Sequence, residues 1–109
     1  MEIIEKDVAG FGIRYSAHSE SDEMGHAFLY VLRNELHEEP FGFMEDVWVE
    51  ERFRGQGVGS ALVRKVIEGA QEHNCYKLVC ASKFSEERVH ALYERLGFFK
   101  NGFELRIDF

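Results

Sequence analysis

The chain has 109 residues, of which 45% are hydrophobic and 30% charged, an ordinary mix for a globular domain. At this length the default expectation is one domain spanning residues 1–109. Lysine and arginine number 13 against 20 aspartate and glutamate, and the formal net charge of −7 argues against non-specific binding to nucleic acid or an anionic membrane.

The first half of the chain is expected to form strands. Its start, MEIIEKDVAG, is too charged for a signal peptide, and no apolar run approaches a membrane span, so we expect a cytoplasmic protein. Strands are expected at 11–17, 26–32 and 41–49, with a turn at 19–23 and a loop at 33–39 before Pro40.

The third expected strand, residues 41–49, is apolar on both faces. Strict alternation places Glu45 with Val47 and Val49 on one face, and Asp46 with Trp48 on the other. We therefore expect a central strand that is covered on both sides.

The second half of the chain is expected to alternate helices and strands. An apolar stripe predicts a helix at 59–73 that ends near Asn74, followed by a buried strand at 76–81. A second helix is expected to start at a Ser85 cap and to end at Gly97. Residues 101–102, Asn-Gly, predict a tight hairpin turn before a final strand with clean alternation. The order indicates a mixed α/β layer protein.

Cysteine and histidine give no metal signal. Cys75 and Cys80 lie five residues apart in or next to the expected strand. Because a strand rises about 3.3 Å per residue, the two cysteines would be too far apart to form a disulfide. No C-x-x-C pair is present, and no two of the five histidines lie three or four residues apart. We expect no metal.

A glycine-rich stretch, RGQGVG, joins the expected central strand to the first helix. Exposed amides at a helix N-terminus can bind an anion, and glycines allow close approach. A P-loop is excluded because Gly59 is followed by Ser60 and not by lysine, and no placement of the dinucleotide fingerprint fits. A plain strand-to-helix turn remains the alternative, although three alternating glycines exceed what a turn needs.

These residues resemble a known family, the GNAT acetyltransferases. Arg54-x-x-Gly57-x-Gly59 matches the family's acetyl-CoA signature, EDVWV upstream looks like its central strand, and VHALYERLGF downstream looks like its late helix. The resemblance covers roughly residues 24–109 and implies a GNAT fold, α/β (α+β), with a mixed, mostly antiparallel sheet and two main helices. The nearest branch is the glucosamine-phosphate N-acetyltransferases.

The resemblance implies acetyl-CoA as co-substrate. Amides from Gln56 to Ser60 would cradle the pyrophosphate, Arg54 would begin that loop, and the strand backbone at 47–49 would pair with the pantetheine arm. The implied acetyl-CoA residues are Val47, Trp48, Val49, Arg54, Gly55, Gln56, Gly57, Val58, Gly59 and Ser60. The three strand residues read equally well as core.

Two residues are candidates for catalysis. The resemblance implies that Tyr93 protonates the leaving CoA thiolate, whereas its place on an apolar helix stripe also fits a packed core tyrosine. Glu45 is a candidate general base, because burial on an apolar strand face would disfavour its charged form. The alternative for Glu45 is a carboxylate paired with an arginine such as Arg33.

The implied function is transfer of acetyl from acetyl-CoA to a primary amine by direct attack in a ternary complex. The alternative is a non-catalytic acyl-CoA-binding or regulatory module. The acceptor would be a small-molecule or peptide amine, with no nucleic acid or membrane partner. Residues 5–10 are too few for the helices that shape the family's acceptor pocket, so the site should be open or completed by a second chain. We therefore predict a homodimer.

Overall fold

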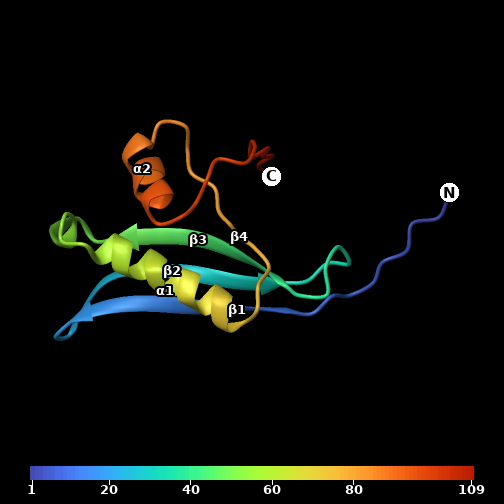
Figure 1. Ribbon diagram of the computed structural model, residues 1–109, viewed down its shortest axis with the longest axis horizontal. Helices are drawn as coiled ribbons and strands as arrows, with labels where there is room; N and C mark the ends of the chain where they lie inside the picture. Colours follow the sequence, from blue (N-terminus) through green and yellow to red (C-terminus); the bar gives the residue numbers. More distant parts are fainter.

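The protein is built from two layers, a four-stranded sheet and a helix packed on one of its faces (Figure 1). The computed structural model describes all of residues 1–109. The strands are β1 (Gly10–Ser19), β2 (Asp22–Leu32), β3 (Phe41–Val49) and β4 (Leu78–Val79), in the order β1-β2-β3-β4. β4 pairs with β3 in parallel, and the other neighbours are antiparallel. The mixed sheet predicted from sequence is confirmed.

The helices lie close to their predicted positions. α1 spans Val58–Glu72 and ends where Asn74 takes a left-handed φ of 58°. α2 spans Glu87–Arg95, and Gly97, with a φ of 111°, ends it. The predicted Ser85 cap is wrong by one residue, because Glu86 is the N-cap and makes no side-chain cap bond. No helix has the length and apolar character needed to cross a membrane.

The core lies between α1 and the inner face of β2 and β3. Nine hydrophobic residues are buried there: Ala27, Leu29, Val31, Met44, Val58, Leu62, Val63, Val66 and Ala70. Full burial of a Val, Leu or Met side chain contributes about 1.5–3 kcal/mol. This small cluster therefore fixes α1 on the sheet, and with it the loop that leads into the helix.

β3 does not alternate strictly, which corrects one prediction. Phe28 pairs with Glu45 and His26 pairs with Trp48, so Asp46 and Val47 together oppose a single residue of β2. This is a β-bulge, and it reverses the phase of the strand. Val47 and Val49 therefore pack on the core, as Met44 does, while Trp48 is 46% exposed. The expectation that both faces are covered is wrong for this half of the strand.

β4 is much shorter than the predicted strand at 76–81. Only two register pairs join it to β3, Gly42 with Leu78 and Phe43 with Val79. Beyond Phe43 the two strands no longer pair. The rest of β3 therefore has a neighbour, β2, on one edge only.

The predicted C-terminal hairpin and final strand do not form. Residues 99–109 have no regular secondary structure and run beside α2, above the sheet in the view of Figure 1. Phe103, Leu105, Ile107 and Phe109, which share one face in the alternating pattern, are 75% exposed or more. An alternating pattern prepares a segment for a sheet, but a strand also needs a neighbour for its backbone hydrogen bonds, and this segment has none within the chain.

The packing of α1 on β1 yields a prediction at Gly69. A Cβ built there would fall on the Tyr15 hydroxyl and lie 3.2 Å from its Cζ. Alanine in a helix interior is normally favoured over glycine by about 1 kcal/mol. We nevertheless expect Gly69→Ala to lower the free energy of unfolding by about 1–3 kcal/mol through overpacking. Urea denaturation measures it.

The matched control is Tyr15→Phe, which removes the hydroxyl in the way. In the Tyr15→Phe background we expect Gly69→Ala to cost clearly less than in the wild-type chain, as a double-mutant cycle would show. A stabilising effect of Gly69→Ala alone would contradict the close packing of these two residues.

Candidate active site

The loop between β3 and α1 presents a run of backbone amides without protein acceptors. Phe53 and Arg54 donate to the carbonyls of Glu50 and Glu51, and Ala61 donates to Gly57. Between them, no amide from 55 to 60 donates to a backbone or side-chain acceptor. Six consecutive donors at the positive end of a helix dipole form a site that suits an anion.

Glycine is needed at two places in this loop. Gly55 and Gly57 have φ values of 79° and 84°, in the left-handed region that side chains disfavour. Gly57 is also the N-cap of α1, and glycine has no side chain that could cap the helix. The turn therefore leaves the first amides of the helix uncapped.

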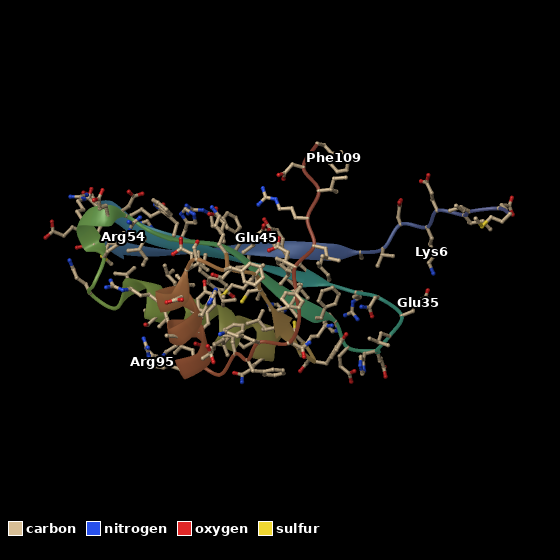
Figure 2. All side chains as sticks on the ribbon, turned by 90° about the horizontal axis from the view of Figure 1, so that it is seen from above. Lys6, Glu35, Glu45, Arg54, Arg95 and Phe109 are labelled. Carbon is tan, nitrogen blue, oxygen red and sulfur yellow. The ribbon has the colours of Figure 1, made fainter.

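Arg54 fixes this loop to the end of β3. Its Nε donates to the Val49 carbonyl at 2.9 Å, and its guanidinium lies 4.7 Å from the centre of the Trp48 ring. Figure 2 shows Arg54 at the end of the molecule where β3 turns into the loop. The side chain is thus occupied within the protein, and the amides carry the site's capacity for an anion.

The free edge of β3 continues from this loop toward β4. The Glu50 amide donates to the Met24 carbonyl at 2.8 Å, and Trp48 pairs with His26 in the same register. Because alternate residues of a strand turn their backbone groups to opposite sides, those of Val47 and Val49 point away from β2. The side chains of Val47 and Val49 pack on the core. Their backbone faces the gap where β4 has ended.

Tyr93 lies on α2, close to Cys80, the residue that follows β4. It packs against the core and against Phe98, with ring centres 5.5 Å apart. Burial, and secondarily the nearby Cys80 thiol, raise the pKa of Tyr93 to about 12. The phenol is therefore protonated at neutral pH and is a proton donor.

Cys80 follows β4 directly and neighbours Tyr93. Burial raises the pKa of its thiol to about 11, so it is almost entirely protonated at neutral pH. Both cysteines are free, as expected. Cys80 is not among the predicted site residues, and its only signal in the sequence is the apolar run LVCA.

Glu45 differs from its prediction. Its carboxylate is exposed and has no hydrogen bond or ion pair, so neither the expected burial nor the alternative pairing with Arg33 is found. The physical reason is that Glu45 points to the face opposite buried Met44, and no element of the chain covers that face at Glu45. Figure 2 shows Glu45 near the middle of the molecule, on the sheet.

Asp46 is exposed, as is Trp48, with which it was predicted to share a face. Strict alternation would also place it with Met44. It does not share a face with Met44, because the bulge turns it outward, where its Oδ2 lies 3.1 Å from Nε2 of His26. His26 had no signal in the sequence beyond its place in a strand. No three His, Cys, Asp or Glu side chains come together as metal ligands.

Comparisons with known proteins give a consistent result. The family model described as "Acetyltransferase (GNAT) family" matches residues 4–98. A glucosamine 6-phosphate N-acetyltransferase of Trypanosoma brucei brucei is 36% identical over 67 residues, which cover 62% of this chain and 44% of the relative. A thialysine N-epsilon-acetyltransferase of Bos taurus is 38% identical over 55 residues, which cover 50% of this chain and 32% of the relative.

A solved structure agrees with these relatives. A putative acetyltransferase from Agrobacterium tumefaciens superposes with a TM-score of 0.84 and 32% identity, covering 89% of this chain and 68% of that one. The chain thus spans less than half the length of these two curated relatives.

The raised pKa of Cys80 predicts slow alkylation. At pH 8 its thiolate fraction should be about 100-fold lower than that of a thiol with a pKa of 9, because each pKa unit is a factor of ten. In the Cys75→Ser protein, whose only thiol is Cys80, we expect iodoacetamide labelling to be slow at pH 8 and to rise about tenfold per pH unit up to pH 11. Mass spectrometry measures it.

The matched control is Cys80→Ser, which leaves Cys75. Burial also raises the pKa of Cys75, but by less, so this protein should label faster than the Cys75→Ser protein. If Cys80 reacted as fast as free cysteine at pH 8, the burial of its thiol would be contradicted.

Proposed function

Because the chain belongs to the acetyltransferase (GNAT) family, we propose that it acts as a single domain that transfers acetyl from acetyl-CoA to a primary amine. The observation that carries the proposal is that the chain holds three features suited to this co-substrate. Six unbonded amides at the start of α1 adjoin the free edge of β3, and a protonated tyrosine lies close to the residue that follows β4. An anionic, extended thioester matches these three features in that order.

The co-substrate fits this chain by its charge and shape. The amides of Gln56 to Ser60 would bind the pyrophosphate, because they are uncapped and lie at the helix N-terminus. The backbone of Val47 and Val49 would pair with the amides of the pantetheine arm as an added strand does. This arrangement directs the thioester toward the point where β3 and β4 separate, beside Tyr93.

The acetyl transfer is a direct attack. The amine nitrogen forms a bond to the thioester carbonyl carbon, and the carbon–sulfur bond breaks as the tetrahedral intermediate collapses. The thiolate takes a proton from the Tyr93 hydroxyl, and the amine gives one up to Glu45 or to water. A backbone amide at the β3 bulge would stabilise the oxyanion.

Cys80 is the one nucleophile beside Tyr93, and its burial argues against an acetyl-enzyme route. A thiol with a pKa of about 11 is a poor nucleophile at neutral pH, because the thiolate is the attacking form. Direct attack in a ternary complex is thus favoured over acetyl transfer through cysteine.

The exposed position of Glu45 favours a second candidate function. No element of the chain covers the sheet at this carboxylate, so the acceptor side lacks walls of its own. A non-catalytic acyl-CoA-binding module would need only the loop and the free edge of β3. The acetyltransferase remains the better proposal, because Tyr93 adds a proton donor that a binding module does not require.

The acceptor class follows from shared chemistry. The names of the two curated relatives indicate an amino sugar phosphate and a lysine analogue, both of which carry a primary amine. The net charge of −7 and the free carboxylate of Glu45 favour an acceptor that carries positive charge.

The catalytic role predicts a specific loss at Tyr93. We expect Tyr93→Phe to lower kcat about 100-fold or more, because general acid catalysis contributes about 10²–10⁴. The affinity for CoA should stay within about twofold, because the phenol acts on the leaving group. A thiol-release assay with a panel of amines, together with calorimetry, measures both.

The matched control is Tyr30→Phe, at an exposed tyrosine stacked on Phe28. This variant should keep wild-type kcat. Binding of acetyl-CoA without turnover of any amine would favour the binding module, and wild-type kcat in Tyr93→Phe would remove Tyr93 from the mechanism.

The acceptor side could be completed by a second copy of the chain, and we propose a homodimer. The apolar side chains of the C-terminal segment, Phe103, Leu105, Ile107 and Phe109, are exposed, which supports an interface. Light scattering after size exclusion should give twice the chain mass at micromolar concentration. Leu105→Glu with Ile107→Glu should give a monomer, and a monomeric wild-type protein would contradict the proposal.

A further inference from the structure

The bulge in β3 holds one residue in the left-handed backbone region, which aspartate and asparagine enter more readily than other side chains. Asp46 has a φ of 50°, in the left-handed region that few residues other than glycine adopt. It lies where Asp46 and Val47 oppose one residue of β2. Something must offset the cost of that conformation, which is about 1–3 kcal/mol.

A hydrogen bond across the sheet holds Asp46 in place. Its Oδ2 lies 3.1 Å from Nε2 of His26, and because a carboxylate only accepts, the imidazole donates. The His26 side chain is only 18% exposed, and its ring meets that of Phe28 edge-on at 5.8 Å. The donor is therefore held by packing on β2.

The other side of the imidazole is also supported. Nδ1 of His26 lies 3.9 Å from a Glu23 oxygen, and Arg14 of β1 binds both oxygens of Glu23, at 2.6 and 3.0 Å. Four side chains from three strands thus form one line that ends on the bulge. The histidine cannot turn without breaking contacts on both sides.

The bulge determines which face of the sheet the next side chains of β3 occupy and which way their amides point. Without it, strict alternation would turn Val47 and Val49 onto the outer face and reverse the direction of their amides. With it, both side chains enter the core and the backbone faces the gap beside β4. The phase of these residues therefore depends on one local irregularity.

We propose that His26 and Asp46 form a positioning pair that fixes the bulge and thereby the backbone that receives the thioester arm. The inference rests on the proposed function, since it assigns the pair a role in acetyl-CoA binding and turnover. Neither residue touches the reacting atoms. The pair acts through the direction of the Val47 and Val49 amides.

The pair's position separates this role from a merely structural one. The Asp46 side chain is 62% exposed, and an exposed ion pair contributes little to global stability. Its loss should therefore change the cofactor parameters more than the thermal midpoint.

The test compares four variants. His26→Ala and Asp46→Ala should each raise KM for acetyl-CoA and lower kcat/KM about tenfold, and Asp46→Ala, at the more exposed of the two residues, should keep a thermal midpoint close to wild type. The double variant should be no worse than either single variant, because both remove the same interaction. Asp46→Asn keeps an acceptor oxygen and tolerates positive φ, so it should restore kcat/KM to within about threefold of wild type.

Additive losses in the double variant, or wild-type kinetics in His26→Ala, would overturn the proposal. A second readout covers the case in which the wild-type chain shows no turnover, which would refute the proposed function and not the pair. In the free protein, the cross-strand contact between His26 and Trp48 and the amide shifts of Val47 and Val49 should change in Asp46→Ala and persist in Asp46→Asn. Unchanged NMR signals in Asp46→Ala would refute the pair by itself.

Discussion

Val63 and Val66 of α1 are fully buried in one cluster with Leu29 of β2 and Met44 of β3. This contact sets the distance and angle between the end of β3 and the start of α1. The amides of the glycine loop lie at the edge of the sheet because the helix is held against it. The first turn of α1 is held against the sheet by its own buried side chain. As a result, its backbone amides have no acceptor within the chain.

A second constraint is the early end of β4. A continuous parallel pairing would satisfy the backbone of β3 and close its edge, but only Gly42 and Phe43 are paired. The remaining edge is therefore exposed and unsatisfied, which is unfavourable for a sheet and useful for a ligand that supplies its own amides. β3 is therefore unpaired on this edge in the same segment that the proposed site uses to bind the pantetheine arm.

Local patterns predicted most of the fold. The apolar stripe of α1 and the Gly97 stop depend on residues close in sequence, and both hold. The glycine loop was also predicted, because glycine permits the positive φ values that Gly55 and Gly57 adopt. Tyr93 was placed correctly on the apolar side of its helix, since helical periodicity alone determines that face.

The remaining features depend on partners far along the chain or absent from it. The bulge is held by His26, which is 20 residues before Asp46, and strict alternation cannot anticipate it. The exposure of Glu45 depends on what covers the outer face of the sheet, which no local pattern encodes. The alternation of residues 103–109 describes a segment fit for a sheet, but no strand of this chain pairs with it.

The most direct test of the central claim is an NMR titration of ¹⁵N-labelled protein with CoA and, separately, with pantetheine, which lacks the pyrophosphate. CoA should shift the amides of residues 56–60 together with those of Val47 and Val49. Pantetheine, at a concentration that saturates the strand shifts, should move the strand amides and leave the loop amides in place. Loop amides that do not respond to CoA, or that respond equally to pantetheine, would contradict the assignment of this loop to the pyrophosphate.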